Sequence, residues 1–260
     1  MMSKLTPEDV VLRYSKRGMN ILKKYLKDGY CRTAAEKLLH AERGTVLLTT
    51  GFYVAGYAET DGPLGTVAVA EALNHLGFHS VVVTDKYCKG FFELKQLDVE
   101  YVDIAADEQV YEDILDKYHP VYMISIERCG ENAEHEYANM RGVSITSETA
   151  AIDHLFELAP EKHIPTIGVG DGGNEIGMGN VKDIISEKLE LNPCVVPVDD
   201  LIIATTSNWG AYALTAWLQK LSGEEVLFTF AEAEPYLAAT LEIGSVDGVL
   251  KEKKMGVDGF

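Results

Sequence analysis

Residues 165–180 combine the residue types of a catalytic site with the glycines of a tight backbone turn. An apolar run, 165–170, has the character of a buried strand, and Asp171, Asn174 and Glu175 follow it. Several glycines in succession indicate that the backbone turns sharply or approaches another group closely. Two carboxylates and an amide offer only oxygen donors, which suit Mg²⁺ or Mn²⁺. The segment therefore predicts a divalent-metal site at the carboxyl end of a strand, where open α/β sheets bind their ligands.

Two other interpretations of this segment are open. Gly168, Gly170 and Gly173 satisfy the G-x-G-x-x-G pattern of a dinucleotide-binding loop. Asp171 would then lie inside the phosphate cradle, however, and the strand comes late in the chain for that motif. Asp171 could also cap a purely structural turn. The metal interpretation therefore requires further acids at the same edge of the sheet.

Glu127 meets this requirement, because it directly follows the buried-strand pattern 120–126. Carboxyl ends of different parallel strands meet at one edge of a sheet, which is how α/β sites are assembled. Asp61 lies on a loop before an expected helix, where it is either a helix cap or a further ligand. The residues that we predict to be catalytic and to bind the metal are Asp61, Glu127, Asp171 and Glu175.

Polar residues at the same edge are candidates for binding a small anionic substrate. Arg128 either neutralises Glu127 or clamps a substrate carboxylate. Residues 205–210 bring hydroxyls, an amide and helix-start N–H groups together, which predicts either an anion pocket or a plain helix cap. The predicted substrate-binding residues are Thr50, Gly51, Arg128, Asn174, Thr206, Ser207 and Asn208.

The elements that must position these residues alternate between strand and helix patterns. Amphipathic helices are expected over 6–43, and the tail beyond Gly244 is expected to be loosely held. Expected strands are 44–51, 79–84, 99–104, 120–126, 165–170, 194–197 and 201–205, and expected helices are 64–76, 88–96, 108–118, 149–158, 176–191, 211–221 and 231–241. A polar stretch, 131–146, is a candidate flap over the site. This order predicts a three-layer α/β sandwich with a mostly parallel, Rossmann-like sheet and N-terminal helices packed on it.

Composition limits the classes of partner. The chain has 260 residues, 47% hydrophobic and 25% charged, which is typical of one globular α/β domain spanning 1–260. Its net charge of −18 argues against nucleic acid, and an anionic substrate requires a bound metal or clustered N–H groups. No membrane-length apolar run or signal-peptide pattern is evident, so we expect a cytoplasmic protein, with a homo-oligomer left open. The four scattered cysteines indicate neither zinc nor disulfides.

Four segments together resemble the D-glutamate cyclase-like family, formerly a domain of unknown function. They are 49–51 with 59–63, 125–128, 170–179 and 205–210, and the glycine-rich segment is the most specific of them. The likeness covers the chain from about Thr45 to Leu241. It implies an α/β fold and, from the namesake, lyase chemistry in which D-glutamate loses water to give 5-oxo-D-proline. In the animal namesake this unit is fused to another domain, whereas here we expect it to stand alone.

Under this resemblance the predicted residues take roles. A divalent metal on Glu127, Asp171 and Glu175 would polarise the γ-carboxylate of glutamate. Asp61 or Glu59 would take the ammonium proton as general base. The helix start at 206–210, or Arg128, would hold the α-carboxylate.

Two rival functions use the same residue types. A divalent-metal-dependent phosphohydrolase acting on a nucleotide or small phosphate ester would need the same oxygen ligands and anion pockets. A non-catalytic protein that binds an amino acid or metal would need only the ligands.

Overall fold

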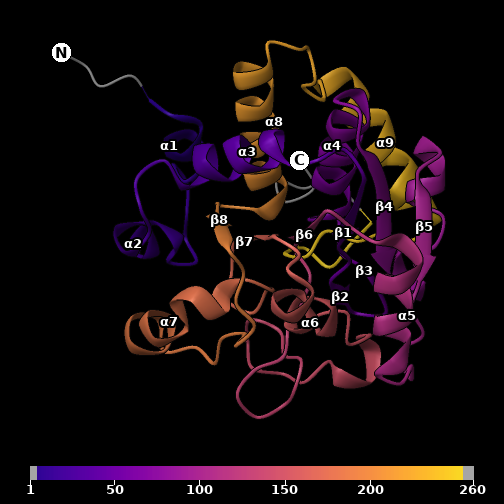
Figure 1. Ribbon diagram of the computed structural model, residues 1–260. Coiled ribbons are helices and arrows are strands. Elements are labelled where there is room, and N and C mark those ends of the chain that lie inside the picture. Colours follow the sequence, from indigo (N-terminus) through magenta and orange to yellow (C-terminus); the bar gives the residue numbers. More distant parts are fainter. Residues whose placement is uncertain (1–4, 254–260) are drawn as a thin grey trace.

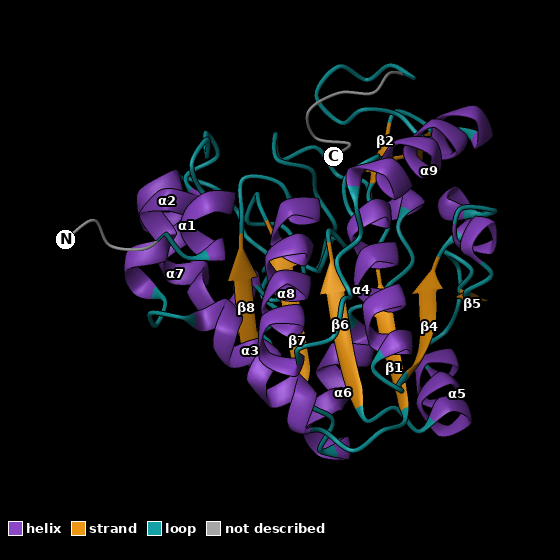
Figure 2. Ribbon diagram, turned by 90° about the horizontal axis from the view of Figure 1, so that it is seen from above, coloured by secondary structure: helices purple, strands orange, loops and turns teal. Residues whose placement is uncertain are grey.

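The computed structural model describes residues 5–253, and six parallel strands form its central sheet (Figures 1 and 2). The spatial order is β5-β4-β1-β6-β7-β8, with bounds β1 Thr45–Thr49, β4 His79–Thr84, β5 Asp98–Tyr101, β6 Tyr122–Ile126, β7 Thr166–Gly170 and β8 Asp200–Ile203. Every pairing in this sheet is parallel, which confirms and sharpens the predicted mostly parallel sheet. This is the strand order of a doubly wound fold. From β1 the chain adds β4 and β5 on one side and then β6, β7 and β8 on the other, so the topological switch point lies between β1 and β6.

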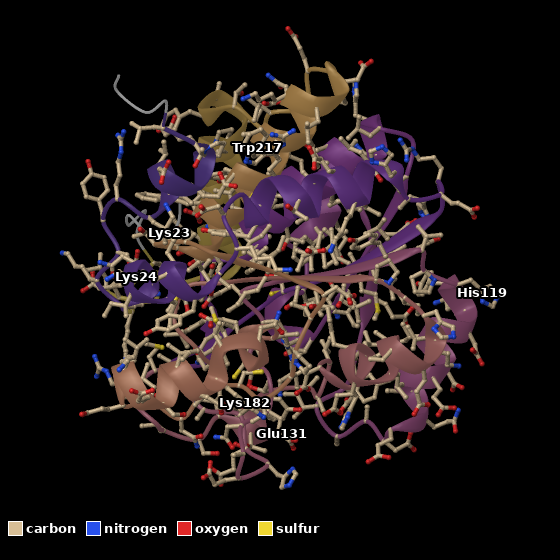
Figure 3. The ribbon with its side chains drawn as sticks, turned by 60° about the vertical axis from the view of Figure 1, so that its left-hand side comes forward. Lys23, Lys24, His119, Glu131, Lys182 and Trp217 are labelled. Carbon is tan, nitrogen blue, oxygen red and sulfur yellow. The ribbon has the colours of Figure 1, made fainter. Side chains whose placement is uncertain are left out.

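Helices cover both faces of the sheet (Figure 1). Along the chain they are α1 Pro7–Val11, α2 Met19–Leu22, α3 Tyr30–His40, α4 Pro63–His75, α5 Gln109–Tyr118, α6 His154–Lys162, α7 Lys182–Leu189, α8 Ser207–Ser222 and α9 Phe230–Ile243. α3, α8 and α4 lie on one face, and α5, α6 and α7 on the other. Side chains fill the space between the layers (Figure 3), so the predicted three-layer sandwich is confirmed. The N-terminal helices pack on this body through contacts of α1 and α3 with α8.

The strands form where the sequence is apolar enough to be buried on both faces. Every residue of β6 and of β7 is buried, and the register pairs Ile124 with Ile167 and with Leu48 of β1. A small antiparallel hairpin, β2 Tyr53–Val54 with β3 Tyr57–Ala58, decorates the loop after β1. Burial on both faces is the expected environment of a parallel sheet.

Several expected elements differ in the structure. The expected helix 88–96 is two 3₁₀ turns, Lys86–Cys88 and Phe92–Lys95, and the expected strand 194–197 makes only an isolated bridge at Cys194. The helix expected from 176 begins at Lys182, because the preceding chain is still a glycine-rich turn with a 3₁₀ segment, Met178–Val181.

The tail beyond Gly244 was expected to be loosely held, but its described part, up to residue 253, makes specific hydrogen bonds. The N–H of Thr60 donates to the carbonyl of Val246 at 2.9 Å, and the N–H of Val246 donates to Ala58 at 3.0 Å. Asp247 is buried and accepts from the N–H groups of the next turn. Residues 245–252, called the strap below, are therefore attached to the loop that follows β3.

Candidate functional site

The strands point their carboxyl ends toward one edge of the sheet, where the loops that follow β1, β6 and β7 gather (Figure 2). A cavity of about 410 Å³ lies at this edge. Its acidic wall is formed by Glu59, Glu127 and Asp171. Residues 139–141 and 143–145 of the predicted flap also line it, together with Gly248, Val249 and Lys251 of the strap, so this part of the flap borders the cavity.

Glu127 is the most constrained member of the acidic wall. It follows β6 directly with a left-handed backbone, φ 50°, which is uncommon for a residue with a side chain. Its N–H donates to Val169 at 3.1 Å, and Ser207 Oγ donates to its Oε2. Burial, followed by the charge of Asp171 and of further carboxylates, raises the pKa of Glu127 well above its ordinary value. The fold therefore gives Glu127 a carboxyl group that binds its proton more tightly than a solvent-exposed glutamate does.

Asp171, the first residue after β7, is buried and faces the same point. Burial raises its pKa well above the ordinary value, and the ion pair of its Oδ2 with Arg17 only partly opposes this. Its Oδ1 has no hydrogen-bond partner among the described residues. A buried carboxylate oxygen without a partner is costly, so this atom is a candidate for a ligand contact.

Glu175 turns back into its own loop. Its carboxylate accepts the N–H groups of Asp171 at 3.0 Å, Gly172 at 2.6 Å and Gly173 at 2.7 Å. A Cβ on Gly172 would lie 2.5 Å from Met140 Sδ and 2.9 Å from Glu175 Oε1, which explains a glycine there. This backbone therefore closely approaches both a side chain of the predicted flap and a side chain of its own loop. The same N–H groups are occupied, so the dinucleotide interpretation finds no support.

Asp61 binds the start of α8. Its Oδ1 accepts from the N–H of Asn208 at 2.7 Å and its Oδ2 from that of Ser207 at 2.9 Å. The Asn208 side chain accepts in return from Gly62 and Gly65 at 2.9 and 2.7 Å. The helix start therefore does bind a carboxylate, but the carboxylate is Asp61. The cap expected for the helix that follows Asp61 is absent, since the N-cap of α4 is Gly62, which has no side chain to cap it. Asp61 caps α8 instead, and its role as a metal ligand stays a prediction.

Arg128 differs from the expectation that it neutralises Glu127. It is fully buried, and its guanidinium donates to Asp85 Oδ2 and the carbonyl of Ala150, each at 2.6 Å, and to the carbonyl of Gly51 at 2.7 Å. Burial of both partners makes the pair with Asp85 structural. Arg128 thereby connects the loops that follow β1 and β6, and its predicted contact with substrate stays a prediction.

The remaining predicted residues surround the acids. Asn174 lines the cavity and its amide donates to the flap carbonyl of Ala138 at 2.8 Å. Thr50 and Thr206 are buried, and their hydroxyls have no hydrogen-bond partner among the residues that the structure describes. Of these three residues, Asn174 is the one that lines the cavity.

Arg17 was not predicted from the sequence. It lies between α1 and α2, lines the cavity and pairs with Asp171. A single arginine on a loop between short helices carries no motif, and only the packing of those helices brings it to the site. No local signal in the sequence could have identified it.

The carboxylates fit a hard divalent cation. Oxygens of Glu127, Asp171 and Glu175 lie within 4.8 Å of one another, as do those of Glu59, Asp61 and Glu127. All donors are oxygen, which suits Mg²⁺ or Mn²⁺. Glu175 in the first set and Asp61 in the second each accept three backbone N–H groups, so these contacts do not separate the two sets. The partnerless Oδ1 of Asp171 makes the first set the stronger candidate.

Comparisons with known proteins show what the chain as a whole is similar to. A family model described as D-glutamate cyclase-like, C-terminal, matches residues 8–260. The human protein D-glutamate cyclase, mitochondrial, is 32% identical over 259 residues, which cover 85% of this chain and 40% of the human protein. A crystal structure of UDP-glucose 4-epimerase from Brucella ovis in complex with NAD has a TM-score of 0.33 and 15% identity, covering 57% of this chain and 49% of that one. That last likeness is too weak to carry an argument. Within residues 5–253 no helix has the length and apolar character of a membrane span.

Proposed function

The chain belongs to the D-glutamate cyclase-like family, and from this premise we propose that it is a metal-dependent carbon–oxygen lyase that converts D-glutamate to 5-oxo-D-proline and water. The observation that carries the proposal is the buried cluster of Glu127, Asp171 and Glu175, two of which face the cavity. The chain spans two fifths of the length of its human relative, so the activity in that relative's name enters here as a proposal.

The reaction needs an activated carboxylate and a neutral amine. The amine nitrogen forms a bond to the γ-carboxyl carbon, one carboxyl oxygen leaves, and two protons from the ammonium group depart with it as water. A Mg²⁺ or Mn²⁺ ion held by Glu127, Asp171 and Glu175 would supply Lewis-acid polarisation of that carboxylate. The cavity walls hold the chain of the substrate in a cyclic conformation, which removes much of the entropic barrier.

Glu59 is the better of the two predicted bases. It lines the cavity beside Glu127 and Asp171, whereas both oxygens of Asp61 are committed to backbone N–H groups. Glu59 takes the ammonium proton and returns it to the departing oxygen. Asp61 acts by holding α8, and with it Ser207, against Glu127.

The test is direct. Purified protein is incubated with D-glutamate or L-glutamate, with Mn²⁺ or with chelator, and the products are followed by proton NMR. We expect metal-dependent 5-oxoproline from the D-enantiomer, and loss of this product in Asp171→Asn. A wild-type protein that binds Mn²⁺ without forming 5-oxoproline, and that releases phosphate from a panel of phosphate esters, would replace the proposal with the phosphohydrolase. The cytoplasmic location expected from the sequence also stays a proposal, since the human relative is mitochondrial by name.

A further inference from the structure

A guanidinium shares the cavity with the carboxylate cluster. We propose that Arg17 binds the α-carboxylate of the substrate, and that it exchanges its ion pair with Asp171 for this contact when the divalent cation binds. The inference rests on the proposed cyclisation, and it adds the residue that recognises the part of the substrate that does not react.

The fold fixes the position of Arg17. The N–H of Thr205, just after β8, donates to the carbonyl of Val11 at 2.9 Å and holds the end of α1 at the site. Gly18 has φ 88° and packs so closely on Leu189 that a Cβ there would overlap that side chain. The loop that carries Arg17 is therefore clamped between β8 and α7. Its side chain, 28% exposed, lies on the cavity wall.

Metal and guanidinium compete for Asp171. Arg17 pairs with Oδ2, and a cation at Oδ1 would place two positive charges on one carboxylate. Their repulsion favours movement of the guanidinium into the cavity. An anionic group that arrives there gives the guanidinium a new partner, so metal and substrate binding reinforce each other.

The other candidates for the α-carboxylate are engaged elsewhere. Arg128 is bound to Asp85 and to two carbonyl groups, and the first N–H groups of α8 bind Asp61. Arg141 and Lys251 line the cavity, but their side chains are exposed. Among the cations that line the cavity within residues 5–253, Arg17 is the one with an ion pair to the carboxylate cluster. A guanidinium also matches a carboxylate with two parallel hydrogen bonds, which an ammonium group does not.

The experiment uses two fragments of glutamate as probes. D-Norvaline keeps the amine and the α-carboxylate and lacks the γ-carboxylate, whereas 4-aminobutyrate keeps the amine and the γ-carboxylate and lacks the α-carboxylate. Their dissociation constants are measured by calorimetry on full-length protein loaded with Mn²⁺. The variants are Arg17→Met, Arg17→Lys and, as a matched control on the same loop, Arg13→Met, whose side chain is exposed.

We expect Arg17→Met to weaken D-norvaline binding on the order of 30-fold and 4-aminobutyrate binding less than about threefold, as for loss of a charged hydrogen bond. Arg17→Lys should fall between wild type and Arg17→Met for D-norvaline. In the absence of probes, Arg17→Met should bind Mn²⁺ about tenfold more tightly, because the competing charge is gone. Arg13→Met should match wild type in all three titrations.

Equal weakening of both probes, or of neither, would overturn the assignment, because a general structural defect does not distinguish the fragments. An unchanged Mn²⁺ dissociation constant in Arg17→Met would overturn the exchange. These titrations need no turnover. A wild-type protein that makes no 5-oxoproline therefore refutes the proposed function, whereas the titrations judge Arg17 separately.

Discussion

Replacing Glu127 with glutamine should stabilise the metal-free protein and weaken its binding of Mn²⁺. The substitution keeps the size of the side chain, and the amide oxygen can still accept from Ser207 Oγ. It removes one negative charge from a cluster whose ligand oxygens lie within 4.8 Å of one another. Glutamine therefore mimics the protonated form that burial and neighbouring carboxylates favour at this position.

The magnitude follows from the geometry. Two unit charges 4 Å apart repel by about 4 kcal/mol at an effective dielectric constant of 20. Arg17 offsets part of this repulsion through Asp171, so we expect Glu127→Gln to gain about 2 kcal/mol at pH 8 in chelator. For a chain of this size that gain raises Tm by about 6 °C. With Mn²⁺ the order should reverse, because the variant lacks a charged ligand and its Mn²⁺ affinity should fall by about 100-fold or more.

The pH dependence has a definite sign. A carboxyl group whose folded pKa is raised binds its proton more tightly in the folded state, so its stabilising contribution is complete below the unfolded pKa and is lost as pH rises toward the folded pKa. The unfolded value for Glu127 is 4.5, and the loss begins above it. The Tm advantage of Glu127→Gln in chelator should therefore be small near pH 4.5 and grow toward pH 8.

Differential scanning calorimetry across this pH range, with chelator and with Mn²⁺, measures each part. The matched control is Glu161→Gln, an exposed glutamate of α6. It should leave both Tm and Mn²⁺ affinity at the wild-type values. If Glu127→Gln lowers Tm at pH 8 in chelator, or retains wild-type Mn²⁺ affinity, the electrostatic account of the cluster is wrong.

Three further substitutions probe the scaffold of the site. Glu175→Ala removes the acceptor of three backbone N–H groups and should cost about 3 kcal/mol in urea unfolding, together with Mn²⁺ binding. Asp61→Asn places a donor against an N–H of α8 and should cost about 2 kcal/mol, while its effect on Mn²⁺ affinity stays below that of Glu127→Gln. Gly248→Ala puts a methyl group where Glu59 lies, so kcat/KM should fall on the order of tenfold or more with a stability change below about 1 kcal/mol. Wild-type kcat/KM in the last variant would remove Glu59 from the mechanism.

The sequence predicted the fold wherever local pattern decides structure. Buried strands such as 120–126 and 165–170 are apolar throughout, and their alternation with helices leaves few topologies other than a doubly wound sheet. The sequence pattern misplaces the start of a helix where tertiary contacts determine that start. The helix expected from 176 begins six residues later because the chain first wraps around Glu175, and that wrapping depends on side-chain geometry that spacing does not reveal.

The candidate site divides in the same way. Glu127 and Asp171 follow strands that are neighbours in the sheet, so their meeting could be predicted from strand order alone. The capping of α8 by Asp61 joins residues 146 and 147 positions apart, and the pair between Arg17 and Asp171 joins residues 154 apart. No periodicity or motif encodes such contacts. They arise from the packing of whole helices on the sheet.

The acidity of the site and the anionic character of its proposed substrate are linked by electrostatics. Glu59, Glu127 and Asp171 on one cavity wall would exclude a dicarboxylate, and the net charge of −18 adds to that exclusion. Positive charge at the wall is therefore a condition of substrate binding as well as of chemistry. A divalent cation reverses the local electric field at the carboxylates. The guanidinium of Arg17 is a second positive charge, and in the proposed exchange its position depends on whether the cation is bound. Metal dependence and recognition of the α-carboxylate are then two consequences of one arrangement, in which the acids that repel the substrate also hold the charges that attract it.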